Sequence, residues 1–221
     1  MTKIKICGIK TIIDAHAAIQ AGADYLGFNF YPKSVRFIEK DSCVEITSVL
    51  KCEYPHIKLV GVCVNSPIDE VKNILEICSL DLVQLHGDET PEMVQAFNGK
   101  AFKAIRLSAE ESVFPFLRSV PESVYPFQSV DKPALLVDAS VKGVYGGSGV
   151  TADWNGAAEL AKKYPLLLAG GLTPENVAEA VSRVKPWGVD VASGVESTPG
   201  EKDAAKMSAF VKAIKRLETG D

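Results

Sequence analysis

The sequence lacks any hydrophobic run near the roughly 18 residues that a membrane-spanning helix needs. Its first residues, MTKIKICGIKT, alternate lysine with isoleucine and lack the apolar core of a secretion signal. It also lacks an excess of basic residues, since the formal net charge is -4 and the isoelectric point is near 5.5. These absences argue against a membrane or a nucleic acid as the main partner. We therefore expect a soluble, cytoplasmic protein.

The cysteines and histidines lack the spacing of a metal site or a disulfide framework. The five cysteines form an odd number without a CxxC pair, and the three histidines are scattered without an HExxH pattern. This fits neither a zinc ribbon nor a set of disulfides. We expect free thiols in a reducing compartment and no metal.

No Gly/Ser/Pro-rich linker divides the chain, so we expect a single domain over residues 1–221. Short apolar runs of strand length recur, separated by segments of helical spacing. Most runs are nearly continuous in apolar residues, which is typical of parallel strands buried on both faces. The runs cover residues 3–9, 25–31, 58–64, 82–86, 102–107, 134–139, 166–169 and 189–192.

Three of the intervening helices are expected to begin at a hydroxyl residue followed by proline: Ser66-Pro67, Thr90-Pro91 and Thr173-Pro174. Each start follows a strand, so a βα unit of about 28 residues is repeated. Eight such units predict an α/β fold, a (β/α)8 TIM barrel. The rival is a doubly wound open sheet, which favours a GxGxxG turn after the first strand. The chain reads Cys7-Gly8-Ile9-Lys10-Thr11 there.

Active sites of such barrels lie at the carboxyl ends of the strands. That rule selects a short set of candidates: Cys7, residues 27–30, Asn65, His86, Arg106, Asp138, Gly170, Gly171, Ser193 and Gly194.

Two glycine-containing turns, Gly170-Gly171 and Ser193-Gly194, follow the last two expected strands. The loops after strands 7 and 8 of such barrels, with a short extra helix, often form a phosphate site. Glycine lets an oxyanion approach backbone N–H groups, and a helix N-terminus adds positive potential. One pair alone would more simply make a tight turn, but two pairs on adjacent strands favour phosphate. The run Gly146-Gly147-Ser148-Gly149 could add N–H donors or form a flexible lid.

Four side chains each have two interpretations. Asp138 ends an apolar run, where a carboxylate is costly to bury without a task or partner, although it could cap a helix or loop. Arg36 lies in a loop between aromatic residues and is either a surface charge or a bidentate clamp for a carboxylate. Cys7 and His86 carry little weight alone. Free cysteine usually behaves as a small buried hydrophobe, and a single histidine beside Gln84 on a strand face is more often a satisfied polar residue than a catalyst.

The chain resembles the phosphoribosylanthranilate isomerase family of tryptophan biosynthesis along essentially its whole length. Glycine pairs are common to many phosphate-binding barrels, whereas KICG combined with the strand-six aspartate and SGVE is specific. The chain departs from the family at Val35, where proline is usual, and in the segment 108–133, which is long for the family. The matching motifs are KICGI (5–9), GFNF (27–30), SVRFI (34–38), GVCVN (61–65), VQLHGDE (83–89), LVDA (136–139), GGSG (146–149), DW (153–154), AGGL (169–172), GVDVASGVE (188–196), PG (199–200) and KD (202–203).

The resemblance implies an Amadori rearrangement of N-(5-phosphoribosyl)anthranilate to 1-(2-carboxyphenylamino)-1-deoxyribulose 5-phosphate, an internal redox reaction that needs no cofactor. It implies that Asp138 is the general acid and Cys7 the general base, and that Arg36 binds the anthranilate carboxylate. The backbone at the two glycine turns would bind phosphate, and His86 and Asp190 would line the pocket. A free aspartate has a pKa of about 3.9 and a free thiol one of about 8.5. Burial would raise the pKa of Asp138, and cationic neighbours or helix N-termini could lower that of Cys7.

Two other function classes remain open at this point. One is a different phosphate-handling barrel enzyme: an epimerase, a transferase like thiamine-phosphate synthase, or the aminoaldose isomerase of histidine biosynthesis. The histidine type would place aspartate where Cys7 stands, and an epimerase would want a metal-binding His/Asp set that is absent here. The other class is a catalytically silent phosphate-binding or regulatory barrel, which would tolerate loss of the acid or the base. Turnover assays with both aminoaldose substrates would separate these functions.

Overall fold

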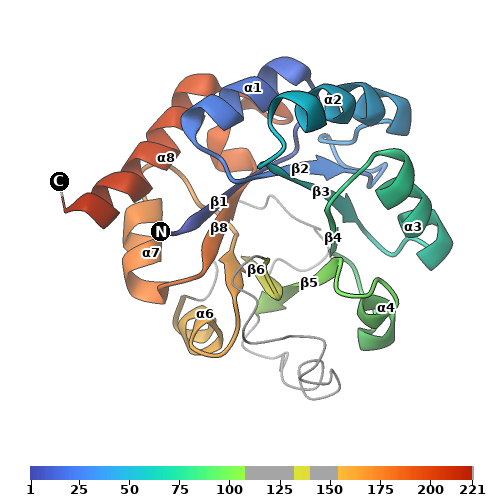
Figure 1. Cartoon of the computed structure of the whole chain (residues 1–221). Coiled ribbons are helices and arrows are strands. Elements are labelled where there is room, and N and C mark those ends of the chain that lie inside the picture. The colour runs from blue at the N-terminus through green and yellow to red at the C-terminus, as the bar shows by residue number, and fades with distance from the viewer. Residues whose placement is uncertain (108–131, 140–153, 221) are drawn as a thin grey trace.

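Parallel strands close into a barrel in the computed structural model, which describes residues 1–107, 132–139 and 154–220 (Figure 1). The strands are β1 Lys3–Cys7, β2 Tyr25–Asn29, β3 Lys58–Cys63, β4 Leu82–Leu85, β5 Ala101–Leu107, β6 Leu135–Ala139, β7 Leu166–Leu168 and β8 Gly188–Val191. Each strand pairs with the next along the chain, and β8 pairs with β1. This closure confirms the (β/α)8 prediction and excludes the doubly wound open sheet.

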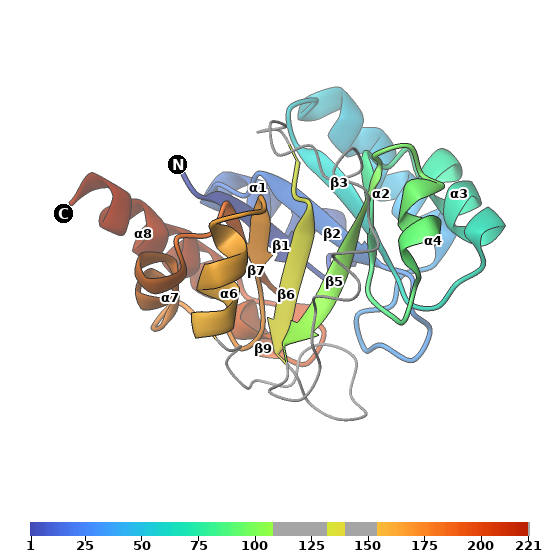
Figure 2. The same ribbon diagram turned by 90° about the horizontal axis from the view of Figure 1, so that it is seen from below.

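Helices surround the barrel and connect successive strands (Figure 1). They are α1 Ile12–Ala21, α2 Lys40–Glu53, α3 Ile68–Ile77, α4 Pro91–Gln95, α6 Trp154–Ala161, α7 Val177–Val184 and α8 Ala204–Thr219. Between β8 and α8 the chain forms a 3-10 helix, η1 Ser193–Val195, and a small hairpin of β9 Glu196–Thr198 and β10 Glu201–Lys202. The hairpin lies at the end of the barrel toward which the arrowheads of β5 and β6 point (Figure 2). The chain between β8 and α8 therefore folds over the carboxyl ends of the strands.

The three expected helix starts have different outcomes. Thr90 caps α4 as predicted, because its hydroxyl oxygen accepts from the backbone N–H of Met93. The prediction for Ser66 is wrong: Pro67 is the N-cap of α3, and the cap has no side-chain hydrogen bond. The prediction for Thr173 is also wrong, because a turn intervenes before α7 begins at Val177.

Two hydrophobic layers hold the barrel together. The larger one packs the strands against the helices and includes Ile4 and Ile6 of β1. The smaller one fills the barrel interior with strand residues, among them Val60, Phe102 and Leu136. Because side chains alternate along a strand, residues two positions apart share a face. A polar residue two positions away from an inner-layer residue on the same strand therefore also points toward the barrel axis.

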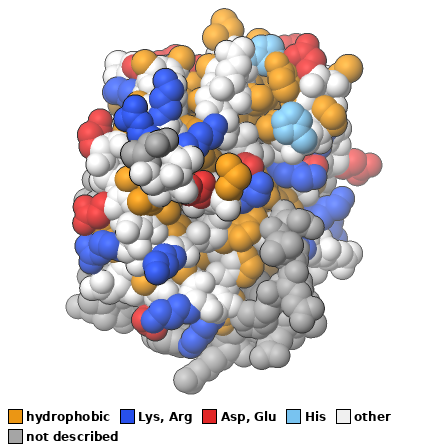
Figure 3. Space-filling model, turned by 60° about the vertical axis from the view of Figure 1, so that its left-hand side comes forward, with side chains coloured by type: hydrophobic (Ala, Val, Ile, Leu, Met, Phe, Trp, Pro, Cys, Tyr) orange, Lys and Arg blue, Asp and Glu red, His pale blue; other side chains and the backbone are white. Residues whose placement is uncertain are grey.

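The described part of the chain contains no helix that is long and apolar enough to cross a membrane. On the face drawn in Figure 3, the described basic side chains lie among acidic, polar and hydrophobic ones. The barrel end that carries the strand carboxyl termini is where the chemistry is expected, and its side chains are described next.

Candidate active site

One pocket at the carboxyl ends of the strands contains most of the predicted site residues. It is lined by Cys7, Arg36, His86, Asp138, Gly170, Gly171, Asp190 and Ser193, together with other residues of these strand ends and loops. Gly194 lies outside the lining, and so do two further strand-end candidates, Asn65 and Arg106. The strand-end rule therefore brings residues from β1, β4, β6 and β8 into one place.

Cys7 is the last residue of β1 and is buried beside Lys5, which shares its inward face. Gly27 of β2 makes this pairing possible: a Cβ at Gly27 would lie 2.8 Å from Cys7 Sγ and 3.2 Å from Lys5 Nζ. The Lys5 ammonium also pairs with Asp190 Oδ1 at 2.7 Å and donates to Gln84 Oε1 at 3.0 Å. The Cys7 thiol, which lines the pocket, thus lies beside a fully buried cation.

Burial raises the pKa of the Cys7 thiol, Lys5 and Lys202 lower it, and Asp190 raises it. Burial outweighs the cations, so the pKa of Cys7 is raised above its ordinary value. The expected cationic neighbours are present, but they only moderate the shift. Burial alone would lower the pKa of Lys5, but Asp190 and Cys7 outweigh burial, so the pKa of Lys5 is raised and the ammonium stays charged.

Asp138 lies on β6 and is buried in the pocket wall, where His86 contacts it. His86 Nε2 lies 3.1 Å from Asp138 Oδ2, and the other ring nitrogen of His86 lies 2.6 Å from Gln84 Nε2. Asp138 is therefore hydrogen-bonded rather than isolated, which offsets part of the cost of burying a carboxyl group. The two strands that carry Cys7 and Asp138 approach the pocket from different sides of the closed barrel.

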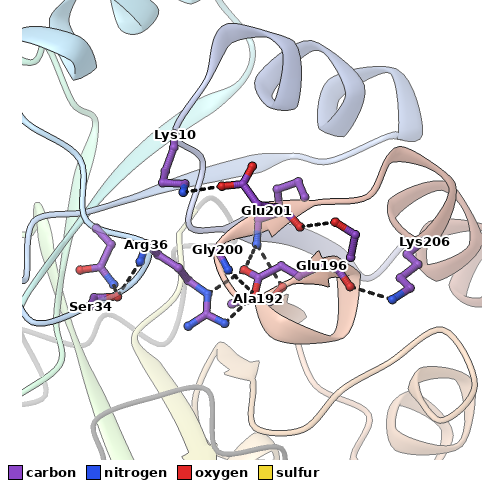
Figure 4. Close-up of polar contacts among 11 residues, drawn as sticks. Lys10, Ser34, Arg36, Ala192, Glu196, Gly200, Glu201 and Lys206 are labelled. Atoms are coloured by element: carbon purple, nitrogen blue, oxygen red, sulfur yellow. Dashed lines mark hydrogen bonds and ion pairs between the residues drawn. The ribbon is translucent and has the colours of Figure 1, made fainter.

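Arg36 reaches the pocket from the loop after β2 and is held by a carboxylate of this chain (Figure 4). Its Nε and Nη2 donate to the two carboxylate oxygens of Glu196, each at 2.7 Å. Its backbone N–H donates to Ser34 Oγ at 3.1 Å. Gly8 leaves room for its side chain, because a Cβ there would lie 2.6 Å from Arg36 Cδ. Glu196 thus fixes the direction of the guanidinium.

Glu196 is the centre of a buried charge cluster at the start of the β9–β10 hairpin. Besides Arg36, it accepts from Lys202 Nζ at 2.8 Å and from the Gly200 N–H at 3.1 Å. Burial acts to raise the pKa of Glu196, but Arg36, Lys202 and Gly200 lower it to a value below the ordinary one. Lys202 also donates to the carbonyl of Ala192 at 3.0 Å, which ties the hairpin to the end of β8.

The two glycine turns adopt backbone conformations that suit close approach of a ligand. Gly170 and Gly171 have φ angles of +92° and +66°, the left-handed region that favours glycine. A Cβ at Gly194 would overlap the carbonyl oxygen of Leu172, so Gly194 lets the loops after β7 and β8 touch. Within the described residues, the backbone N–H groups of Gly171, Ser193 and Gly194 have no hydrogen-bond acceptor. The run 146–149 lies outside the described residues, as does most of the segment 108–133.

The sequence comparisons agree with this geometry. Residues 4–213 match the family model described as N-(5'phosphoribosyl)anthranilate (PRA) isomerase. The chain belongs to the phosphoribosylanthranilate isomerase family. The N-(5'-phosphoribosyl)anthranilate isomerase of Magnetococcus marinus is 44% identical over 220 residues, 99% of this chain and 97% of that protein. That of Geotalea uraniireducens is also 44% identical, over 98% of this chain and 100% of that protein.

Solved structures of the phosphoribosylanthranilate isomerase family have the same fold. The crystal structure of the Thermotoga maritima enzyme superposes with a TM-score of 0.83 at 36% identity, covering 97% of this chain and 99% of that one. Another crystal structure, a complex with reduced 1-(o-carboxyphenylamino)-1-deoxyribulose 5-phosphate, gives a TM-score of 0.79 at 33% identity, with the same coverage of both chains.

Sequence reasoning assigned no role to several residues that shape this family member's pocket. Residues 3–7 alternate between polar and apolar side chains, so Lys5 and Cys7 are expected on the same face of the strand. This alternation could have predicted that Lys5 lies beside Cys7. Gln84 precedes His86 by two residues and therefore shares its face. Glu196 and Lys202 belong to the family motifs GVDVASGVE and KD, but their pairing depends on how the β9–β10 hairpin folds back, which no local pattern shows.

Asn65 and its neighbours organise the loops rather than the pocket. Glu89 accepts from the backbone N–H groups of Asn65 and Gly87, each at 2.8 Å, and pairs with Lys103 at 3.0 Å. The Asn65 side-chain oxygen accepts from the Asp88 N–H at 2.7 Å. These bonds connect the loops after β3 and β4 immediately beyond His86.

Proposed function

We propose that this chain isomerises N-(5-phosphoribosyl)anthranilate to 1-(2-carboxyphenylamino)-1-deoxyribulose 5-phosphate in tryptophan biosynthesis, with Asp138 as general acid and Cys7 as general base. The observation that carries the proposal is the presence of both groups in one pocket, on strands from different sides of the barrel. The reaction needs a proton delivered at the ring oxygen of the sugar and a proton removed from sugar carbon two. Two proton-transfer groups facing one substrate meet that need.

In the first step, protonated Asp138 gives its proton to the furanose ring oxygen. The bond from that oxygen to sugar carbon one breaks, and the nitrogen lone pair forms an iminium ion. In the second step, the Cys7 thiolate removes the proton from carbon two, and the electron pair forms an enolamine. Tautomerisation of the enolamine gives the ketone, so carbon one is reduced while carbon two is oxidised.

Ring opening comes before removal of the proton from carbon two, because the iminium ion favours the Cys7 thiolate and acidifies that proton. Burial raises the pKa of the resting thiol, so the free pocket favours the protonated form. The iminium ion adds a positive charge beside a site that already contains Lys5, and nearby positive charge favours a thiolate. The same iminium ion acidifies the proton on carbon two. Ring opening therefore prepares both the base and its target.

Arg36 supports the anthranilate half of the substrate. Glu196 occupies the Nε–Nη2 edge of the guanidinium. Arginine has five N–H donors arranged on a planar fork, so the Nη1–Nη2 end can hold a second carboxylate with two parallel bonds. Because Arg36 lines the pocket, that second carboxylate is assigned to the anthranilate ring.

The phosphate half is assigned to the turns after β7 and β8. Backbone N–H groups of Gly171, Ser193 and Gly194 have no acceptor among the described residues. Such converging donors form a site for an oxyanion. His86 and Asp190 also line the pocket.

The direct test is turnover of freshly generated N-(5-phosphoribosyl)anthranilate by the purified protein, beside the aminoaldose of histidine biosynthesis as a second substrate. We expect rapid conversion of the anthranilate substrate to the ketose. Exclusive conversion of the histidine-pathway substrate would assign the pocket to the other isomerase. Binding of a phosphate analogue without turnover of either substrate would favour a silent phosphate-binding barrel.

A further inference from the structure

A line of hydrogen bonds connects buried Lys5 to Asp138 through Gln84 and His86, and the last three of these residues line the pocket. Lys5 Nζ lies 3.0 Å from Gln84 Oε1, and Gln84 Nε2 lies 2.6 Å from His86 Nδ1. His86 Nε2 lies 3.1 Å from Asp138 Oδ2. The first two residues are almost entirely buried, with exposed fractions of 0% for Lys5 and 1% for Gln84.

The chemistry of the donors fixes the direction of every bond in this line. An ammonium group has donors only, so the Gln84 atom that faces Lys5 must be the amide oxygen. The amide nitrogen then faces His86, and since it also has donors only, Nδ1 of His86 must accept. A neutral imidazole with an accepting Nδ1 carries its hydrogen on Nε2. That hydrogen is directed at Asp138 Oδ2, which accepts it.

Asp190 reinforces the first bond of the line. It is the partner of Lys5 in the β1–β8 register, and its carboxylate holds the ammonium at 2.7 Å. The neighbouring charge of Asp190 raises the pKa of Lys5 against its burial, so the ammonium stays charged. The amide of Gln84 is therefore held in one orientation by a permanent donor.

We propose that Lys5 and Gln84 are positioning residues that hold His86 as the Nε2–H tautomer, so that His86 donates to Oδ2 of Asp138 and fixes the orientation of the Asp138 carboxyl group in the pocket. The inference rests on the proposed function, in which Asp138 is the general acid.

The tautomer is measured by nitrogen-15 NMR of the histidine rings of the parent protein at neutral pH. His86→Gln identifies the His86 signals among those of His16 and His56. We expect an unprotonated Nδ1 and a protonated Nε2. A protonated Nδ1, or rapid averaging between the two tautomers, would overturn the proposal.

Gln84→Glu provides the matched perturbation, because it keeps the side-chain shape but replaces the amide donor with an acceptor. A carboxylate can still accept from Lys5, but it cannot donate to His86, so Nδ1 of His86 must gain a hydrogen. We expect that NMR change together with a kcat about tenfold lower, the loss of roughly one well-placed hydrogen bond, and product affinity within about threefold. Gln20→Glu, on the exposed surface of α1, is the control and should change neither quantity.

Two outcomes distinguish this proposal from the assignment of the acid itself. A folded Gln84→Glu protein with a protonated Nδ1 and an unchanged kcat would overturn the positioning role while leaving Asp138 as the acid. Full activity of Asp138→Asn, with the Nε2–H tautomer intact in the parent, would overturn the acid assignment instead. If Gln84→Glu does not fold, the NMR result for the parent protein decides the tautomer.

Discussion

At the scale of a single residue, Glu196 both holds Arg36, which the proposed function assigns to substrate binding, and pairs with a second buried cation, Lys202. Its carboxylate satisfies Arg36 and Lys202 at once, and both cations are largely buried. Because it uses one edge of Arg36, it leaves the other end of the guanidinium for the anthranilate carboxylate that the proposed function places there. A lysine at position 36 would keep the charge but lose this geometry.

Glu196→Gln should destabilise the protein, because two buried cations would share a neutral amide. We expect the free energy of unfolding at neutral pH to fall by about 3 kcal/mol, measured by urea denaturation. Glu201→Gln is the control on the same hairpin. Its exposed pair with Lys10 should contribute no more than about 1 kcal/mol.

The pH dependence of stability tests the same cluster. The pKa of Glu196 is lower in the folded protein than in the unfolded chain, where it is near its ordinary value of about 4.3. The unfolded chain therefore binds the proton first, and the contribution of Glu196, complete above that value, is lost as the pH falls through the folded pKa. The parent should lose stability from pH 6 to pH 3 more steeply than Glu196→Gln. Parallel curves would contradict this account of the cluster.

Arg36→Lys should weaken binding of the anthranilate-bearing product while sparing inorganic phosphate. The loss of two charge-assisted hydrogen bonds predicts a Kd higher by roughly ten- to a hundredfold, measured by calorimetry. Arg183→Lys on the surface of α7 is the control for the substitution itself. An equal loss of affinity for both ligands would indicate general electrostatics or a damaged fold instead.

At the scale of an element, the proposed function assigns phosphate binding to the turns after β7 and β8. Gly171 has a φ of +66°, and a side chain there costs about 1–2 kcal/mol in backbone strain. Gly171→Val should reduce affinity for inorganic phosphate by about tenfold or more. Gly220→Val has a comparable φ of +77° in open space at the end of α8, so it controls for strain alone. Equal phosphate affinity in both variants would contradict the assignment of these turns.

The elements themselves were largely predictable from the sequence. All eight expected strands form, and their ends differ by at most a few residues, because buried parallel strands give nearly continuous apolar runs. The helix starts were less predictable: Thr90 caps α4, but Ser66 does not cap α3. The difference arises because α3 begins one residue later, with Pro67 rather than Ser66 at the N-cap.

At the scale of the whole molecule, the closed barrel brings distant residues into contact. Lys5 and Asp190 are 185 positions apart in sequence, yet they are register partners because β8 pairs with β1. The strand-end rule could predict the pocket residues Cys7 and Asp138, since it depends only on where each strand stops. It could not predict the pairs formed by Gln84 or Glu196, because those depend on strand register and on the fold of the hairpin. The single-domain organisation over residues 1–221 stays a prediction.

The most direct measurement is the kcat of Cys7→Ser and Asp138→Asn with N-(5-phosphoribosyl)anthranilate, alongside the affinity of each variant for the product. Cys52→Ser and Asp69→Asn, on the exposed surfaces of α2 and α3, are the matched controls. Serine is a far weaker acid than cysteine, and asparagine cannot donate an acidic proton, although both keep the shape of the pocket. The account predicts a kcat lower by roughly 10²–10⁴-fold for each site variant, near-normal product binding and unchanged controls. A kcat within about threefold of the parent in either site variant would contradict the role assigned to that residue.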